Sequence, residues 1–351
     1  MASTSTDRPT LYFLASCSTA AFSMSISVFT MISVNLPQQH IAQFFNQTIH
    51  QRYGCSFELL LRGNDTTESA LDESCEPPSE KLISTLWGLA NGGPFFIAAL
   101  FSLWSNVLVD RFGRKVTLLI GQNAFCALAN FACAASRSLF HSLELYFVGR
   151  FMIGMSYGVG LSAFSIYSTE IASPNHRGIA GSFSGVISLP LLVTASFIST
   201  NSVLGSHDRW HYLHVVGACL SCIAMLLGLF APESPRFSYF NLQNRAQATR
   251  DLTRLHGSAA SVKKTFHDYD AEYLQAACGN NANRCSMSMV AKQRHLRMGF
   301  FVGILGSLAR SCCGAEIYHM YSAKLFHYAL AEQYLEPVVV TSMAIQVTIG
   351  N

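Results

Sequence analysis

Carboxylates and arginines stand close together at three places in this 351-residue chain, each after an apolar stretch. The first place is Asp110-Arg111-Phe112-Gly113-Arg114-Lys115, the second runs from Glu170 to Arg177-Gly178, and the third is Pro232-Glu233-Ser234-Pro235-Arg236-Phe237. A guanidinium group can bind a carboxylate through two parallel hydrogen bonds, so each place could hold a strong ion pair. Membrane anchoring alone is the simpler interpretation, but independent anchors would rarely repeat so regularly.

The other reactive side chains indicate neither catalysis nor metal binding. The 12 histidines show no spacing typical of a catalytic triad or a metal site. Cys219 and Cys222 lie within an apolar stretch without further ligands nearby, which favours packing over zinc. Because the chain also lacks a G-x-x-x-x-G-K phosphate loop, we expect no nucleotide-driven pumping. We therefore predict no enzyme activity, no metal and no cofactor.

The composition predicts the elements that position these residues. Half of the residues are hydrophobic and only 12% are charged, with a mean hydropathy of +0.29, whereas soluble proteins carry about 25% charged residues. The apolar stretches are about 20 residues long, enough to cross the hydrocarbon core as helices. We predict an all-α integral membrane protein that binds no nucleic acid. The predicted spans are 11–34, 82–109, 116–135, 143–167, 179–204, 212–231 and 298–321, followed by an eighth helix from Pro337 that is cut off at Asn351.

Basic residues in the short loops predict the orientation. With a cytoplasmic N-terminus, the inner side holds Arg8, Arg111, Arg114, Lys115 and Arg177, and the loop 35–81 is extracellular. That loop contains two acceptor sequons for N-glycosylation, at Asn46 and Asn64. It also contains Cys55 and Cys75, for which we predict a disulfide bond because the compartment would be oxidising.

The motifs resemble those of the sugar-porter branch of the major facilitator superfamily, in particular the facilitative hexose transporters. They keep the family's order and spacing over about 230 residues. The residues that carry the resemblance are N-L-P-Q at 35–38, D-R-F-G-R-K at 110–115, G-R-F-M-I-G at 149–154, Y-S-T-E-I-A-S-P-N-H-R-G at 167–178, P-E-S-P-R-F at 232–237, and N-R-A with L-x-x-L-H-G in 244–257.

The resemblance implies a major facilitator fold of two helical bundles that rock around a solute site at the membrane midplane. It implies a complete six-helix N-terminal bundle in 1–232 and a cytoplasmic inter-bundle segment in 233–296. Within that segment we expect an amphipathic helix over 242–256 and a flexible tip at 279–283. The C-terminal bundle would begin in 297–351 and be truncated in helix 8, so this chain alone should not transport.

The resemblance also implies roles for individual charged residues. Carboxylates and arginines at the cytoplasmic ends can lock the two bundles together when the path is open outward. The implied gate residues are Asp110, Arg114, Glu170, Arg177, Glu233 and Arg236. Arg150, in the family's G-R motif, is costly in lipid, and we expect it to pack inside the bundle against a carboxylate, carbonyl or water.

The sequence departs from the family at the expected sugar site. Arg310, Ser311 and Glu316 stand where hexose porters carry amide side chains, and Thr348 stands at an eighth-helix asparagine. One hypothesis is an anionic or zwitterionic solute held by Arg310, and another is a proton-responsive pair of Glu316 and His319. A third hypothesis is that these positions have changed by mutation without selection, because the protein no longer transports a solute.

We therefore predict a plasma-membrane carrier, embedded in the lipid bilayer, that moves a hexose such as glucose or a related small solute by facilitated diffusion. The alternatives are a non-transporting or truncated regulator and a proton-linked carrier of a non-sugar solute. A seven-helix receptor is disfavoured, because its acidic-arginine triplet would follow the third helix, whereas Asp110-Arg111-Phe112 follows the second predicted span.

Overall fold

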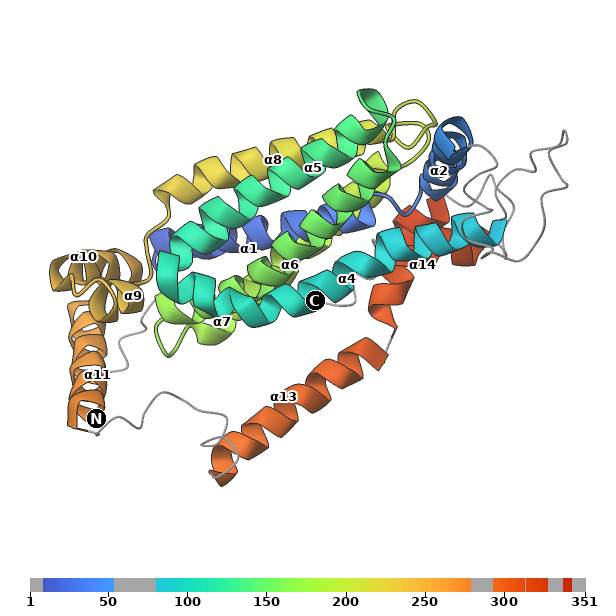
Figure 1. Ribbon diagram of the computed structural model, residues 1–351. Helices are drawn as coiled ribbons and strands as arrows, with labels where there is room; N and C mark the ends of the chain where they lie inside the picture. Colours follow the sequence, from blue (N-terminus) through green and yellow to red (C-terminus); the bar gives the residue numbers. More distant parts are fainter. Residues whose placement is uncertain (1–8, 54–79, 279–292, 313, 328–336, 343–351) are drawn as a thin grey trace, which may run out of the picture.

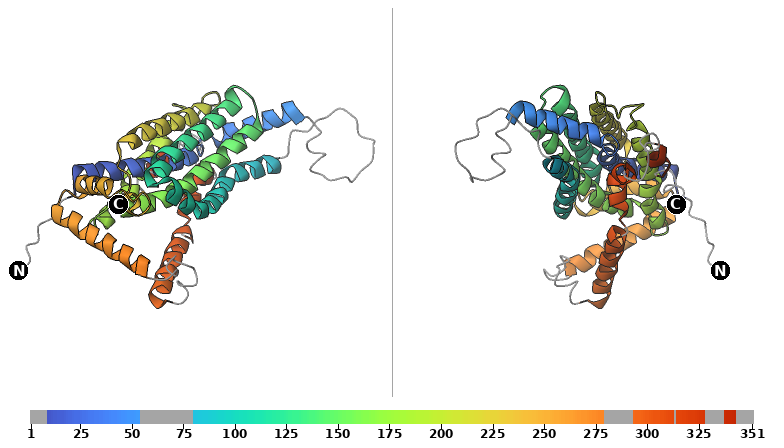
Figure 2. Two further views of the ribbon diagram at one scale, coloured as in Figure 1. Left: turned by 60° about the vertical axis from the view of Figure 1, so that its left-hand side comes forward. Right: turned by 90° about the vertical axis from the view of Figure 1, so that its right-hand side faces the viewer.

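The computed structural model describes residues 9–53, 80–278, 293–312, 314–327 and 337–342. In this part of the chain six helical segments are long and apolar enough to cross a membrane, and they pack side by side as one bundle (Figures 1 and 2). The third span combines a π-helical segment, η1, with helix α5. The spans are α1 Leu11–Ile32, α4 Glu80–Phe112, η1 Val116–Gly121 with α5 Gln122–Ser138, α6 Leu143–Ile171, α7 Arg177–Ile198 and α8 His211–Phe230.

Further helices mark the two ends of the bundle. Helix α2, Gln38–Tyr53, lies at one end, here named the α2 end (Figure 1). At the opposite α9 end lie α9 Pro235–Phe240, α10 Arg245–His256 and α11 Ala259–Cys278. Two more helices follow, α13 Arg294–Cys312 and α14 Ala315–His327, and α14 reaches back to α1 near the α2 end.

Glycines allow α4 and α6 to approach closely. A Cβ atom built on Gly158 would lie 2.2 Å from the carbonyl oxygen of Ala98, and one on Gly154 would lie 2.3 Å from that of Pro94. Both distances are far below van der Waals contact. In lipid, where the hydrophobic effect does not drive helices together, such backbone approach supplies much of the packing energy.

Polar side chains inside the bundle form hydrogen bonds between spans. Gln122, which follows η1 directly, donates from Nε2 to the hydroxyl of Ser27 on α1 at 3.0 Å. Ser27 in turn lies 3.2 Å from the hydroxyl of Ser156 on α6. These bonds join three spans without an ionised group, which suits an interior with little water.

The predicted all-α membrane fold and its first six spans are confirmed, with ends shifted by a few residues. The predicted span 298–321 is not one continuous helix, because α13 ends at Cys312 and α14 begins at Ala315, and Gly314 between them has φ +71°. That left-handed conformation suits glycine and interrupts a regular helix.

Two segments for which we predicted no membrane span or helix contain helices. The stretch 35–81 includes α2, which folds against the bundle because Ile41, Phe44, Phe45 and Ile49 are buried. The polar stretch after Gly257 includes α11, anchored by buried Val262 and Tyr269. The tip at 279–283 lies outside the described residues.

The amphipathic helix predicted over 242–256 exists as α10, but its buried face differs. Leu252 and Leu255 are buried as expected, whereas Leu242 is exposed and Ala246 points outward. Ala248 takes the buried position instead, because the helix begins only at Arg245 after its Asn244 cap.

Candidate functional site

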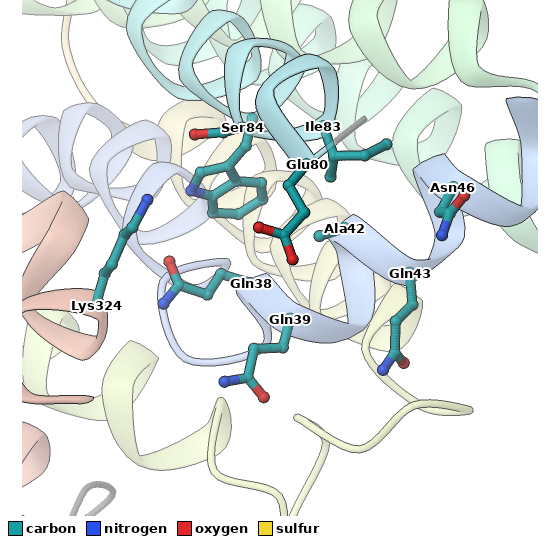
Figure 3. Close-up of a pocket in the computed structure, with 10 residues that line it drawn as sticks. Gln38, Gln39, Ala42, Gln43, Asn46, Glu80, Ile83, Ser84 and Lys324 are labelled. Carbon is teal, nitrogen blue, oxygen red and sulfur yellow. The ribbon is translucent and has the colours of Figure 1, made fainter. Parts of the chain in front are cut away.

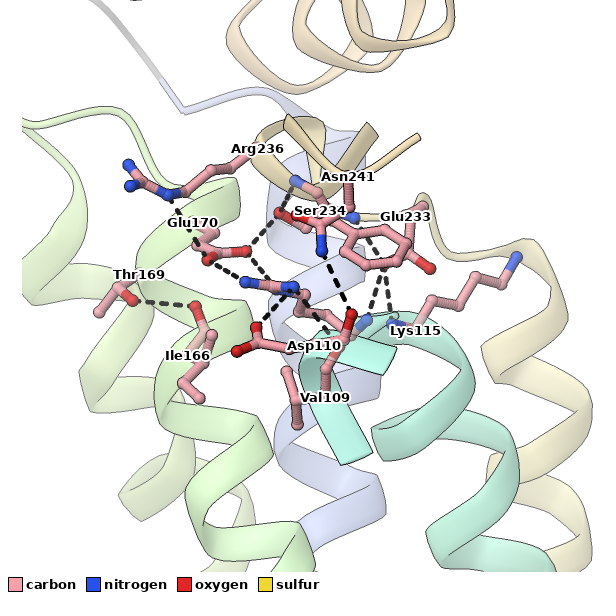
Figure 4. A network of polar contacts seen from close by, with 12 residues as sticks. Val109, Asp110, Lys115, Ile166, Thr169, Glu170, Glu233, Ser234, Arg236 and Asn241 are labelled. Carbon is pink, nitrogen blue, oxygen red and sulfur yellow. Dashed lines mark hydrogen bonds and ion pairs between the residues drawn. The ribbon is translucent and has the colours of Figure 1, made fainter. Parts of the chain in front are cut away.

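A polar network at the α9 end includes Asp110, Glu170 and Arg236 (Figure 4). Arg114 is its centre. Its Nε donates to Oε2 of Glu170 at 2.9 Å and its Nη2 donates to Oε1 at 3.1 Å, so the pair is bidentate. Asp110, one helical turn earlier, lies 3.2 Å from Nη1. The guanidinium also stacks 5.1 Å from the ring centroid of Phe237. One arginine thereby joins α4, α6 and α9.

Glu233 accepts hydrogen bonds from the backbone rather than from a base. Its Oε1 receives the N–H groups of Arg114 at 3.1 Å, Lys115 at 2.9 Å and Ser234 at 2.9 Å. The turn before Arg114 is built for this approach, because Gly113 has φ +94° and a Cβ there would lie 2.7 Å from Oε2 of Glu233. A carboxylate thus ties the loop after α4 to the start of α9.

Arg236 extends the network towards α11. Its Nε lies 4.0 Å from Oε1 of Glu170, and its terminal nitrogens donate to both carboxylate oxygens of Glu272. Arg177, the first residue of α7, makes no ion pair with any residue in the described ranges. It lines, with Glu170, Arg236 and Glu272, a polar cavity of about 450 Å³.

The six predicted gate residues therefore take four different positions. Arg114, Glu170 and Asp110 form a compact ion-pair cluster, which we name the clasp. Glu233 braces the clasp loop and Arg236 bridges from the clasp to α11, while Arg177 only borders the cavity beside them.

Two charged residues outside the spans, Glu233 and Arg236, have shifted pKa values. Burial raises the pKa of the Glu233 carboxyl, and the three backbone donors and Arg114 oppose that rise without cancelling it. Partial burial is the largest single effect on the pKa of Arg236 and acts to lower it, but the hydrogen bond to Glu272 and the negative charges of Glu272 and Glu170 together outweigh burial, so the net shift is upward. Arg236 therefore stays charged, whereas Glu233 is the carboxyl whose charge burial disfavours.

Three residues that form hydrogen bonds in this network were not predicted from the sequence. Ser234 donates to Oε2 of Glu170 at 2.5 Å and caps α9, and Tyr167 donates to the carbonyl of Pro232 at 2.8 Å. The Ser-Pro pair at 234–235 is a recognisable helix-start signal and could have indicated Ser234. Glu272 gave no such signal, because α11 itself was not expected.

Arg150 lies fully buried among α1, α4 and α6. It donates to the carbonyl oxygens of Ala90 at 3.1 Å and Thr30 at 3.3 Å, and to Oδ1 of Asn91 at 3.0 Å. No acidic residue in the described chain forms an ion pair with it. Its charge is therefore met by three oxygen dipoles, which makes it a cross-link inside the bundle.

The predicted solute-path residues are only partly placed. Arg310 and Ser311 belong to α13, and Glu316 and His319 belong to α14. The side chains of these four and all of Thr348 lie outside the described part.

The remaining predicted sites are the sequon asparagines Asn46 and Asn64 and the cysteines Cys55 and Cys75. Asn46 stands within α2, where its side chain is half-buried, and the sequon's Thr48 is buried. Asn64, Cys55 and Cys75 lie outside the described residues, so their modification stays a prediction. Within the described ranges, no cluster of three or more histidine, cysteine or acidic side chains could hold a metal ion.

Comparison with known proteins decides the family. A sequence model for the family described as "Sugar (and other) transporter" matches residues 7–350. The chain belongs to the sugar transporter family. Its relatives in this family are non-enzymatic membrane transporters, and this protein is accordingly an integral, multi-pass membrane protein.

Similar members of the sugar transporter family are named as facilitated glucose transporters. Member 3 from Gallus gallus is 23% identical over 300 residues, covering 84% of this chain and 54% of that protein. Member 2 from Rattus norvegicus is 26% identical over 281 residues, covering 79% and 52%. The chain thus spans about half the length of the curated relatives it matches.

Solved structures show the same fold. The proton:xylose symporter XylE bound to 6-bromo-6-deoxy-D-glucose superposes with a TM-score of 0.73 at 15% identity, covering 96% of this chain and 67% of that one. A partially occluded inward-open XylE from E. coli superposes with a TM-score of 0.67, also at 15% identity. The all-helical major facilitator fold is therefore established for this sugar transporter family member.

Proposed function

We propose that this protein moves a hexose such as glucose, or a related small uncharged solute, by facilitated diffusion. The clasp carries the proposal. Its three residues come from the ends of α4 and α6, and it is joined to α9, so it can hold spans in one arrangement and release them in another. Family members named as facilitated glucose transporters support the solute class.

The proposed mechanism is alternating access, in which the bundle of α1–α8 rocks against a second bundle. Arg114 is well suited to hold one state because it is 7% exposed and binds Glu170 in bidentate fashion. Arg177 and Arg236 border an open polar cavity beside the clasp, where a carboxylate from another element could bind in the closed state. Breaking those contacts would open the path.

We further propose that the α9 end faces the cytoplasm and that the protein resides in the plasma membrane. The basic residues Arg111, Arg114, Lys115 and Arg177 gather at this end, as the positive-inside rule favours. Epitope tags inserted beside Asp110 and after Arg236 should both be reached only from the cytoplasm. Tags on opposite sides of the membrane would contradict the topology and the clasp together.

Uptake of radiolabelled D-glucose tests the function in cells that express the carrier with both bundles, because the chain 1–351 alone is predicted not to transport. We expect saturable uptake that discriminates against L-glucose. The Arg114→Ala variant should lose most of it, while Arg111→Ala serves as the matched control, because Arg111 lies three residues earlier in the last turn of α4 and is exposed. Equal entry of both enantiomers, or equal effects of the two substitutions, would overturn the proposal.

A second candidate, a non-transporting regulator, is favoured by one observation. Arg310, Ser311 and Glu316 occupy positions where the resemblance leads us to expect amides that bind sugar hydroxyls. If the protein is such a regulator, cells should take up D-glucose equally with and without it. A proton-linked carrier would instead show uptake that collapses when a protonophore dissipates the pH gradient.

A further inference from the structure

A groove lies between α5 and α8, far from the clasp. The two spans pack side by side, and the groove follows the last turns of α5 and the first turns of α8 (Figure 1). Its volume is about 480 Å³, within the range of about 300–1,000 Å³ typical of small-molecule sites. Nothing in the proposed clasp mechanism uses this groove.

Large side chains form the walls of the groove and small ones form its floor. Phe131 on α5 and Ile223 on α8 are 60% and 48% exposed, whereas Ala134 and Ala135, which also line the groove, are only 4% exposed. Alanine has no rotamers to reorganise, so this floor is smooth and rigid. Because α5 and α8 are membrane spans, the exposed apolar walls face hydrocarbon. The groove must therefore be filled from the bilayer.

The groove spans one leaflet of the bilayer. From Phe131 to Leu139 the α5 backbone rises by about 12 Å, close to the roughly 15 Å that make up half of the hydrocarbon core. Helix α5 ends at Ser138 and α8 begins at His211, both at the α2 end (Figure 1). The groove therefore runs from the membrane interface at the α2 end towards the bilayer midplane. In the topology proposed above, this is the outer leaflet.

A hydroxyl group lies at the interface end of the groove. Ser138 lines the groove and is exposed, and its hydroxyl donates to the carbonyl oxygen of Ala134 at 3.0 Å. A hydroxyl oxygen carries two lone pairs, so Ser138 can still accept a hydrogen bond from a ligand. Deeper in the groove, the thiols of Cys219 and Cys222 are only weakly polar. The groove thus matches a long apolar body with one hydroxyl at its outer end.

The charge of the lining distinguishes between classes of lipid. No charged side chain is among the described residues that line the groove. Arg137, the neighbour of Ser138 in the sequence, is 15% exposed, lies 3.6 Å from Asp208 and stacks over the ring of Trp210 at 5.8 Å. It is therefore engaged elsewhere. A phospholipid finds no basic group here for its phosphate, whereas an uncharged hydroxyl needs none.

The cavity at the α2 end has the opposite character. It lies between α2, α4 and α14, and its walls include Gln38, Gln43, Glu80 and Lys324 (Figure 3). Burying apolar surface against such amides and charges would strip them of water. A largely apolar ligand therefore fits the groove between α5 and α8 and not that cavity.

We propose that the groove between α5 and α8 binds a sterol from the outer leaflet. A sterol is a flat, rigid, apolar molecule with one hydroxyl, so its hydroxyl would lie beside Ser138 while its rings cover the alanine floor between Phe131 and Ile223. A sterol bound there would join two spans and stabilise the N-terminal bundle. The leaflet follows from the proposed topology, whereas the groove itself does not depend on transport.

Photochemical cross-linking tests the proposal. The full chain is reconstituted in phosphatidylcholine nanodiscs with a cholesterol analogue that carries a diazirine on its ring system. We expect adducts within 131–139 and 215–223, located by mass spectrometry, and unlabelled cholesterol should suppress them. Phosphatidylcholine with a diazirine in its acyl chain is the control probe and should show no preference for these two stretches.

Two matched pairs of variants use exposed positions, so that the fold is kept. Cys222→Phe fills the groove, whereas Leu226→Phe lies one turn further along α8 and outside it. Phe131→Ala removes a wall, whereas Leu128→Ala, on the preceding turn of α5 and 57% exposed, does not. Sterol cross-linking should fall about five- to tenfold in Cys222→Phe and in Phe131→Ala, and it should be unchanged in both controls.

Two results would overturn the sterol site. One is equal sterol cross-linking of Cys222→Phe and Leu226→Phe. The other is preferential labelling of 131–139 and 215–223 by the phosphatidylcholine probe that cholesterol does not suppress, because phospholipid chains would then fill the groove. The uptake assay separates this inference from the proposed function. If transport is absent, Cys222-sensitive cross-linking still supports the sterol site; if cross-linking is absent, saturable D-glucose uptake still supports the carrier.

Discussion

Replacing Glu170 by glutamine should destabilise the protein by about 3 kcal/mol. The side chains of Arg114 and Glu170 are only 9% and 12% exposed, so water cannot hydrate the guanidinium once its partner is neutral. Removing one member of a buried pair costs roughly 3–5 kcal/mol. Asp110 remains 3.2 Å away but is 67% exposed, and an exposed partner contributes at most about 1 kcal/mol. The lower end of the range therefore applies.

The free energy of unfolding can be measured in mixed lipid and detergent micelles by titration with sodium dodecyl sulfate. Asp110→Asn is the matched control and should cost less than about 1 kcal/mol, since this carboxylate is mostly hydrated. The double variant Arg114→Gln with Glu170→Gln should be less destabilised than the sum of its single variants. If Glu170→Gln costs no more than Asp110→Asn, or if the single effects simply add, the clasp is not a buried ion pair.

Three further predictions concern neighbouring features. Gly113→Ala should cost about 1–3 kcal/mol, because φ is +94° and the new Cβ meets Glu233, whereas Gly178→Ala, with open space around it, should be neutral in the same unfolding assay. Burial raises the pKa of Glu233, so wild-type stability should fall as pH rises through that raised value; an unfolding series over pH should show no such fall for Glu233→Gln. Arg150→Met should cost less than Arg150→Ala in thermal unfolding, because methionine fills the buried volume that alanine leaves empty; equal losses would show that packing contributes nothing there.

The spans could be predicted because lipid imposes a simple rule on length and hydropathy. A stretch such as 212–231 has no alternative to a helix in hydrocarbon, and α8 ends within one residue of that prediction. Helix α2 could not be predicted by the same rule. Its apolar residues Ile41, Phe44, Phe45 and Ile49 follow a helical period, but its length is too short to signal a span.

The clasp was predictable in its members but not in its pairing. Bidentate geometry needs an arginine and a carboxylate brought together from different helices, and the sequence fixes only their distance along the chain. Arg236 illustrates the limit, since its main partner is Glu272 on α11, 36 positions later in the chain. Tertiary packing decided that choice.

The π-helical segment Val116–Gly121 has a consequence for how the third span can evolve. Gln122 donates its backbone N–H to the carbonyl of Thr117, five positions earlier, so one residue more than an α-helix needs is stored in the turn. Deleting one of these six residues would convert the π-helical turn into an α-helical turn, so the span would stay continuous and the residues after it would keep roughly their angular positions. Gln122 and Asn123 would then still lie beside the serines of α1. The third span can therefore lose one residue at this turn without turning its polar groups towards lipid.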